Sequence, residues 1–391
     1  MKKRNEELQN SRFFKVYLIL VGATPMLSTD FYLPALPSIS AYYDTTDAMT
    51  NLTMILFTAA LAVSSLLWGP LSDKYGRRPV SIAGGSFYFA GSLLCVFAPT
   101  IEVMVISRVL QAVGGGAAVM VSSALVKDVF DADRQERVLS IVQGMALIGP
   151  AIAPTIGALI LKVANWHGIF VMMAAMGAVV MAGALYFSET LREPLATGVF
   201  AALGRLHVVL RNRRFVFIVI IFSIPSIPIM AFINASPYIF QNRFGLSEQV
   251  YSLFFAASAI SMMIGSFAYA PISRRFGRTF AAYFGLGMVA LCGAGILLAG
   301  GTSPFVFILF IIPSSFAVAM CKPLCIFLGL NAQESDTGSV SSLIGFANLM
   351  FCSLGMVILM LFGDYLIGVG VLYLVFCSAG ACLFAAFLRK V

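Results

Sequence analysis

The chain has 391 residues, of which 60% are hydrophobic and only 11% are charged, and its mean hydropathy is +0.94. A soluble domain carries roughly a quarter of charged residues, so this composition excludes the ordinary classes of soluble enzyme and indicates a protein whose solvent is lipid. The net charge of +8 could suggest a nucleic-acid ligand, but the positions of the basic residues provide another explanation.

Twelve apolar stretches, separated by polar or turn residues, are each long enough to span a bilayer as a helix. They lie at about residues 13–36, 49–71, 78–98, 102–126, 137–161, 167–187, 214–240, 249–272, 279–299, 303–328, 337–362 and 366–388. The first stretch follows three basic residues, as in a signal peptide, but it is too long for one and eleven more spans follow. We therefore predict an all-α integral membrane protein with twelve transmembrane helices.

The longest polar stretch, residues 188–213, divides the chain into two halves of six spans. We predict an N-terminal bundle at 1–187, a cytoplasmic linker at 188–213 and a C-terminal bundle at 214–391. With the N-terminus inside, 22 of the 25 basic residues lie on the inner side, only Lys162 and Arg243 lie outside, and Arg108 lies within a span. The positive-inside rule then places both termini in the cytoplasm and explains the charge without nucleic acid.

The two halves contain a related turn. The segment GPLSDKYGRR at 69–78 follows the second span, and APISRRFGRT at 270–279 follows the eighth, 201 residues later. The first spans of the halves are separated by a similar number of residues. Two parallel six-helix repeats are typical of transporters that bind substrate near the middle of the membrane, where the repeats meet.

Asp30 is the only acidic residue, and Arg108 the only basic residue, well inside a predicted span. A buried carboxylate is costly unless it is paired or protonated, and such residues usually serve function. We predict that Asp30 carries the coupled proton and contacts substrate, with a purely structural role as the alternative. Because Asp30 and Arg108 lie at similar depth, we expect a direct or water-bridged ion pair, which either tunes Asp30 or is static.

A cluster of charges and glycines is predicted at the inner ends of helices two to four. Opposite charges there could hold the inner mouth closed as a conformational latch, with simple surface charge as the alternative. The residues of this predicted latch are Gly69, Asp73, Gly76, Arg77, Arg78 and Asp128.

Helices five and seven carry residues that alter helix geometry. Small residues and prolines in helix five predict a kinked, closely packed contact between the halves, at Gly144, Gly149, Pro150, Pro154 and Gly157. Helix seven contains three prolines, and broken helices at membrane depth usually line a cavity. We therefore expect Asn234 and Tyr238 to contact substrate, with packing as the alternative, and we take Tyr32, Asn51 and Gln143 as weaker candidates in the N-terminal half.

Several of these segments resemble known motifs. Residues 69–80 resemble the signature loop of the major facilitator superfamily, Arg108–Gly115 its fourth-helix motif, and Gly144–Gly157 the fifth-helix motif of antiporters. Residues 28–37 and 336–345 are similar to the first and eleventh helices of Bcr/CflA-type drug/proton antiporters. His167 and Asp336 depart from that subgroup.

The resemblance implies a proton-coupled antiporter that exports small amphipathic compounds by alternating access. The alternative is a dedicated exporter of one metabolite, such as a metallophore, peptide or sugar. A channel is disfavoured because no ring of polar residues forms a filter, and an enzyme because no acids, histidines or metal ligands cluster at one depth. We expect a monomer in the cell's inner membrane, with protons, amphipathic substrates and lipid as partners and without nucleic acid, cofactor or metal.

Overall fold

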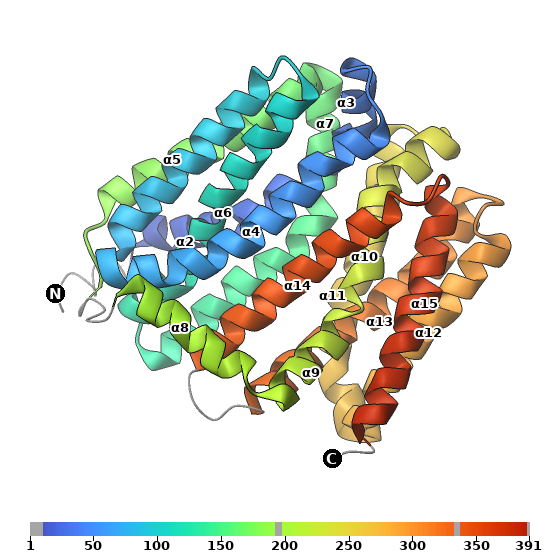
Figure 1. The fold of residues 1–391 in the computed structure, drawn as a ribbon. Coiled ribbons are helices and arrows are strands. Elements are labelled where there is room, and N and C mark those ends of the chain that lie inside the picture. The colour runs from blue at the N-terminus through green and yellow to red at the C-terminus, as the bar shows by residue number, and fades with distance from the viewer. Residues whose placement is uncertain (1–10, 192–197, 332–336, 389–391) are drawn as a thin grey trace. The chain divides into compact units, whose positions relative to one another are not determined.

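The computed structural model describes residues 11–191, 198–331 and 337–388, and these residues are almost entirely helical (Figure 1). Eleven segments in this part of the chain are long and apolar enough to cross a membrane. One of them, Ile148–Tyr186, belongs to α7 (Ala132–Tyr186), whose 55 residues would extend about 80 Å, far more than one crossing needs. α7 is broken at Asn165, where φ is 50° and ψ is −166°. It therefore contains the fifth and sixth predicted spans, and the twelve-helix prediction is confirmed.

The chain forms two compact units. The first comprises Met1–Tyr32 and Leu52–Arg205, and the second comprises Leu33–Asn51 and Leu206–Val391. The segment 33–51 therefore packs with the second unit, although it lies between the first two spans of the N-terminal half in sequence.

The first unit contains the N-terminal helices. They are α2 (Arg12–Asp30), most of α4 (Asp47–Tyr75), α5 (Arg77–Val96), α6 (Ile101–Val129) and α7. Close packing of α5 on α6 depends on glycine: a Cβ added at Gly114 would collide with the backbone of Tyr88, and one at Gly91 with the backbone of Gln111. Arg77, at the start of α5, and Arg108, in α6, are therefore carried by a tightly packed pair of helices.

The second unit contains the remaining elements. They are η1 (Leu33–Ala35), α3 (Leu36–Tyr42), α9 (Arg213–Ser223), α10 (Ser226–Pro237), the π-helix η2 (Tyr238–Arg243), α11 (Glu248–Phe276), α12 (Arg278–Ala299), α13 (Pro304–Asn331), α14 (Thr337–Leu359) and α15 (Tyr365–Leu388). The seventh predicted span is interrupted between α9 and α10, next to Pro225, which lacks the N–H that a continuous helix would use.

A further helix, α8 (Val199–Leu210), lies within the stretch that the sequence analysis treats as a polar linker. It begins after the polar residues at 188–198 and is itself rich in apolar residues. Val209 is buried with Phe215 and Ile218 of α9 in a hydrophobic cluster of the second unit. The end of this helix is therefore fixed to the second unit by apolar burial.

Candidate functional site

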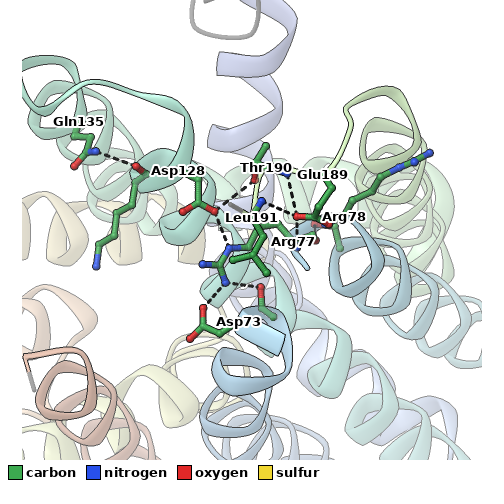
Figure 2. A network of polar contacts seen from close by, with 11 residues as sticks. Asp73, Arg77, Arg78, Asp128, Gln135, Glu189, Thr190 and Leu191 are labelled. Atoms are coloured by element: carbon green, nitrogen blue, oxygen red, sulfur yellow. Dashed lines mark hydrogen bonds and ion pairs between the residues drawn. The ribbon is translucent and has the colours of Figure 1, made fainter. Parts of the chain in front are cut away.

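The turn between α4 and α5, residues 69–78, is called here the N-half turn. Asp73 lies in the last turn of α4 and Arg77 is the first residue of α5. Arg77 Nη1 donates to Asp73 Oδ1 at 2.5 Å, and Nε donates to Asp128 Oδ2 at 2.8 Å (Figure 2). Arg77 is only 8% exposed, so its charge is neutralised within the protein. The structure thus brings together three residues of the predicted latch.

The sequence analysis missed a fourth participant, Glu189, which follows the end of α7. One carboxylate oxygen of Glu189 accepts the backbone N–H of Arg77 at 2.8 Å, and the other accepts that of Arg78 at 3.1 Å (Figure 2). The first N–H groups of a helix have no partner within the helix, and Gly76 has no side chain to cap them. Glu189 supplies that cap from a segment 112 residues away. One feature of the sequence could have indicated this contact. Glu189 directly follows the predicted sixth span, and this end of the sixth span lies on the same predicted side of the membrane as the start of the third span.

Gly76 is required by this geometry. Its φ of 104° and ψ of 160° lie in a region that is essentially restricted to glycine. A Cβ at this position would also collide with the carboxylate of Glu189. The glycine therefore permits both the turn and the close approach of the capping group.

Two other residues of the predicted latch lie outside the ion-pair network. Arg78 donates to the backbone carbonyls of Ala184 and Leu185 in the last turn of α7, at 3.3 Å in each case. Arg78 therefore satisfies carbonyls at the end of that helix, which is a favourable position for a cation. Gly69 lies earlier in α4, and a Cβ there would meet no atom within 4 Å.

Arg108 of α6 is fully buried in the first unit. Its Nη1 donates to Gln111 Oε1 at 2.5 Å, and the centre of the guanidinium lies 4.0 Å from the ring centroid of Phe57 and 4.7 Å from that of Tyr32. Phe170 lies farther away, at 5.9 Å. A desolvated arginine over aromatic rings gains about 2 kcal/mol from cation–π attraction. Aromatic rings and an amide thus hold this cation.

Asp30 is the last residue of α2 and is 6% exposed. Its Oδ2 has no hydrogen-bond partner, and no ion pair joins it to Arg108. The predicted direct Asp30–Arg108 ion pair is therefore wrong. Depth along two helices does not fix which way their side chains point, and Arg108 instead turns toward Gln111, one turn farther along its own helix, and the rings. The water-bridged form of the pair stays a prediction.

The candidate substrate residues fall into separate places. In the first unit, Tyr32 lies over Arg108, and its hydroxyl is 2.9 Å from Thr53 Oγ1. In the second unit, the Tyr238 hydroxyl donates to Asn51 Oδ1 at 3.1 Å. Asn234, in α10, is fully buried and neither its Oδ1 nor its Nδ2 has a partner. The side chain of Gln143 lies outside the described part of the structure.

The glycines and prolines of the predicted antiporter helix lie in the first part of α7. Pro150 and Pro154 are inside the helix. A Cβ at Gly157 would collide with the carbonyl oxygen of Phe31, and one at Gly149 would approach Leu27 at 3.4 Å, whereas Gly144 has open space around it. Of the three glycines, only Gly157 is required for close packing against the end of the first span, within the first unit, because the distance at Gly149 is an ordinary van der Waals contact.

These features define a class of protein, an all-helical membrane transporter built from two related six-helix bundles. A family model described as "Major Facilitator Superfamily" matches residues 18–360. The chain therefore belongs to the major facilitator superfamily.

Similar proteins include transporters and proteins named for multidrug resistance. A multidrug resistance protein, MdtL, from Shewanella oneidensis is 28% identical over 346 residues, which cover 86% of each chain. The MdtL protein from Salmonella paratyphi B is 32% identical over 240 residues, 61% of each chain. Among solved structures, a peptide transporter, POT, matches with a TM-score of 0.73 at 16% identity, covering 96% of this chain and 94% of the other. The xylose transporter XylE from E. coli matches with a TM-score of 0.69 at 15% identity, covering 97% of each. These two structures support the fold alone.

Within the described residues, no group of three or more histidine, cysteine, aspartate or glutamate side chains could hold a metal ion.

Proposed function

We propose that this protein is a proton-coupled antiporter that exports small amphipathic compounds by alternating access. The relatives that carry the name multidrug resistance protein support the substrate class. The observation that carries the proposal is Asp30, a carboxyl group within a membrane-spanning segment, buried and with an oxygen that lacks a protein partner.

The chemical argument rests on competition for Asp30. An ionised carboxylate in this environment is costly without a partner, so it gains stability by accepting a proton or by contacting a cationic or hydrogen-bonding substrate. The two events exclude each other at one carboxyl group. Proton binding from the outer side would release substrate, and proton loss to the inner side would allow substrate to bind again, which is antiport.

Arg108 has a supporting role in this proposal. Its guanidinium is held by Gln111 and by aromatic rings and remains charged at any working pH. It therefore makes no direct ion pair with Asp30, whose carboxyl group stays available for a proton or a substrate.

The candidate substrate contacts are the residues that the sequence analysis singled out. We propose Asp30, Tyr32, Asn51, Gln143, Asn234 and Tyr238. Asn234 offers the strongest support, because a buried amide with four unmet hydrogen-bonding positions is expensive and a polar ligand group would satisfy them.

The remaining parts of the proposal concern architecture. We propose bundles at 1–187 and 214–391 joined by a cytoplasmic linker, a monomer, and an inner-membrane location with both termini in the cytoplasm. The ion-pair network of Arg77 with Asp73 and Asp128 would act as the latch of the inner mouth, because it ties the ends of α4 and α6 to the start of α5.

The test is transport in vesicles with an imposed pH gradient and a panel of amphipathic compounds. Asp30→Asn should abolish proton-driven export while leaving inserted, folded protein. Glu102→Gln removes an exposed carboxyl at the start of α6 and is the matched control, which should keep full activity. Full export by Asp30→Asn would overturn the proposed coupling, and export of one compound alone would favour a dedicated exporter.

A further inference from the structure

The second repeat contains a turn with the same backbone conformation as the N-half turn. This C-half turn, residues 270–279, connects α11 to α12. Gly277 has φ 87° and ψ 158°, close to the 104° and 160° of Gly76. With the offset of 201 residues, Arg278 corresponds to Arg77. Arg274, however, stands where the first repeat has Asp73, so the charge at that position is reversed.

The C-half turn presents its charges to the surroundings. Arg274, Arg275 and Arg278 are all exposed. No described residue forms an ion pair with Arg274 or Arg275 within 4 Å. The N-half turn, in contrast, encloses Arg77 between two carboxylates. Arg274 and Arg275 therefore place two exposed positive charges at the C-half turn, without an ion-pair partner among the described residues.

Exposed aromatic rings adjoin these arginines. Phe276 is 55% exposed and Phe280 is 46% exposed, and their ring centroids are 5.1 Å apart. The guanidinium of Arg275 lies 5.3 Å from the ring of Phe276. The surface thus combines cations with apolar rings at the junction of two membrane-spanning helices.

The first repeat shows what an anion does at this kind of turn. There the Glu189 carboxylate accepts the first N–H groups of α5. In the second repeat, Gly277 provides no side-chain cap for α12. The position that corresponds to Glu189 is occupied in sequence by Lys390, which lies outside the described residues. The second repeat therefore does not encode a carboxylate at that position.

We propose that the surface formed by Arg274, Arg275, Phe276, Arg278 and Phe280 binds the headgroup of an anionic phospholipid from the adjacent leaflet. Guanidinium groups form strong, charge-assisted hydrogen bonds with phosphate. The exposed rings of Phe276 and Phe280, at adjoining ends of α11 and α12, offer apolar contact to an acyl chain at the boundary with the headgroups. A lipid supplies both a phosphate for the arginines and an acyl chain for the rings. A free anion supplies only the former, so the exposed rings favour the lipid.

The experiment places a reporter within the surface. Phe276→Trp introduces a fluorophore there, and the protein is reconstituted in vesicles that contain brominated phosphatidylglycerol or brominated phosphatidylcholine as quenchers. Leu298→Trp is the matched reporter, because Leu298 is 87% exposed at the opposite end of α12. The signal of the parent chain, from its two tryptophans, is subtracted.

Each arginine near the membrane surface should favour the anionic lipid roughly fivefold. We therefore expect at least a fivefold preference for phosphatidylglycerol at Phe276→Trp and less than a twofold preference at Leu298→Trp. Adding Arg274→Gln and Arg275→Gln to the first reporter should remove the preference, and high salt should weaken it.

Two results would overturn the proposal. One is an equal preference at the two reporter positions, and the other is a preference that survives loss of both arginines. Quenching by brominated phosphatidylcholine monitors insertion in every variant, so a misfolded protein cannot imitate either result. The outcome is independent of transport and hence of the proposed antiport.

Discussion

The N-half turn and the C-half turn have the same backbone but opposite electrostatic surroundings. Each has a glycine with positive φ, 104° at Gly76 and 87° at Gly277, between two membrane-spanning helices. In the first, the arginine after the glycine is buried and bridges Asp73 and Asp128. In the second, Arg278 is exposed and Arg274 replaces the acid. The comparison shows that both repeats can keep the same turn geometry although the arginine after the glycine is buried in an ion-pair network in one and exposed in the other.

The difference depends on partners that lie far away in sequence. Asp128 is 51 residues from Arg77, and Glu189 is 112 residues from it, yet both contact the start of α5. The turn alone supplies the glycine and one acid. Asp128, at the end of α6, supplies the second acid, and Glu189, after the end of α7, supplies the helix cap. The burial of Arg77 therefore depends on residues from three separate helix ends.

The largest effect is expected from removing the central cation. Arg77→Ala leaves Asp128 and Asp73 facing each other without their shared partner, which should lower the free energy of unfolding by about 3 kcal/mol. Arg278→Ala, at the equivalent exposed position, should change it by less than about 0.5 kcal/mol. Thermal and denaturant unfolding of the purified variants would measure both.

A conservative change separates charge from geometry. Arg77→Lys keeps the positive charge but cannot donate to two carboxylates from a planar group, so an intermediate loss is expected. If Arg77→Ala and Arg278→Ala destabilised the protein equally, the proposed contrast between the two turns would be wrong.

The sequence predicted the charged residues of the N-half turn because a motif and a helix end locate them along the chain. It did not predict Glu189, because nothing in a polar stretch indicates which backbone N–H groups its carboxylate will meet. It also left a direct and a water-bridged pairing of Asp30 with Arg108 open, and the direct one is not formed. Hydrophobic spans fix depth, whereas the choice of partner depends on the rotation of each helix and on the aromatic rings around Arg108.

The helices themselves were predictable because backbone groups in lipid must be satisfied within each span. The positions where these helices are interrupted were only partly predictable. Pro225 indicated the interruption of the seventh span, and the break of α7 at Asn165 lies between the predicted fifth and sixth spans. The form of that break, a single residue with φ 50°, was not predictable. The apolar helix α8 was missed because the charged residues around it dominated that stretch.

A smaller difference between the two turns is expected when their glycines are replaced. Alanine at either position must adopt a backbone conformation that costs about 1–3 kcal/mol. At Gly76 the added Cβ would also displace the Glu189 carboxylate, whereas at Gly277 it would meet no atom within 4 Å. Gly76→Ala should therefore destabilise the protein more than Gly277→Ala, by about the 1 kcal/mol that a helix cap contributes.

The discriminating measurement is a double-mutant cycle with Glu189→Ala. Once the capping carboxylate is absent, Gly76→Ala should cost no more than Gly277→Ala, since only backbone strain is left. An excess cost at Gly76 that persisted in the Glu189→Ala background would show that the collision with Glu189 is not its cause.

The smallest change in stability is expected when the second repeat is given the acid of the first. Arg274→Asp would place a carboxylate four residues before Arg278, as Asp73 stands before Arg77. An exposed pair of this kind contributes about 0.3–0.5 kcal/mol, and a negative charge in the last turn of α11 opposes the helix dipole by a similar amount. The unfolding free energy should therefore shift by less than about 0.5 kcal/mol, while the preference of the C-half turn for anionic lipid should fall. A clear stabilisation, above about 1 kcal/mol, would mean that the acid within the turn is sufficient to close it. The contributions assigned to Asp128 and Glu189 would then have to be reduced, because the corresponding positions of the second repeat are Gly329 and Lys390 in sequence.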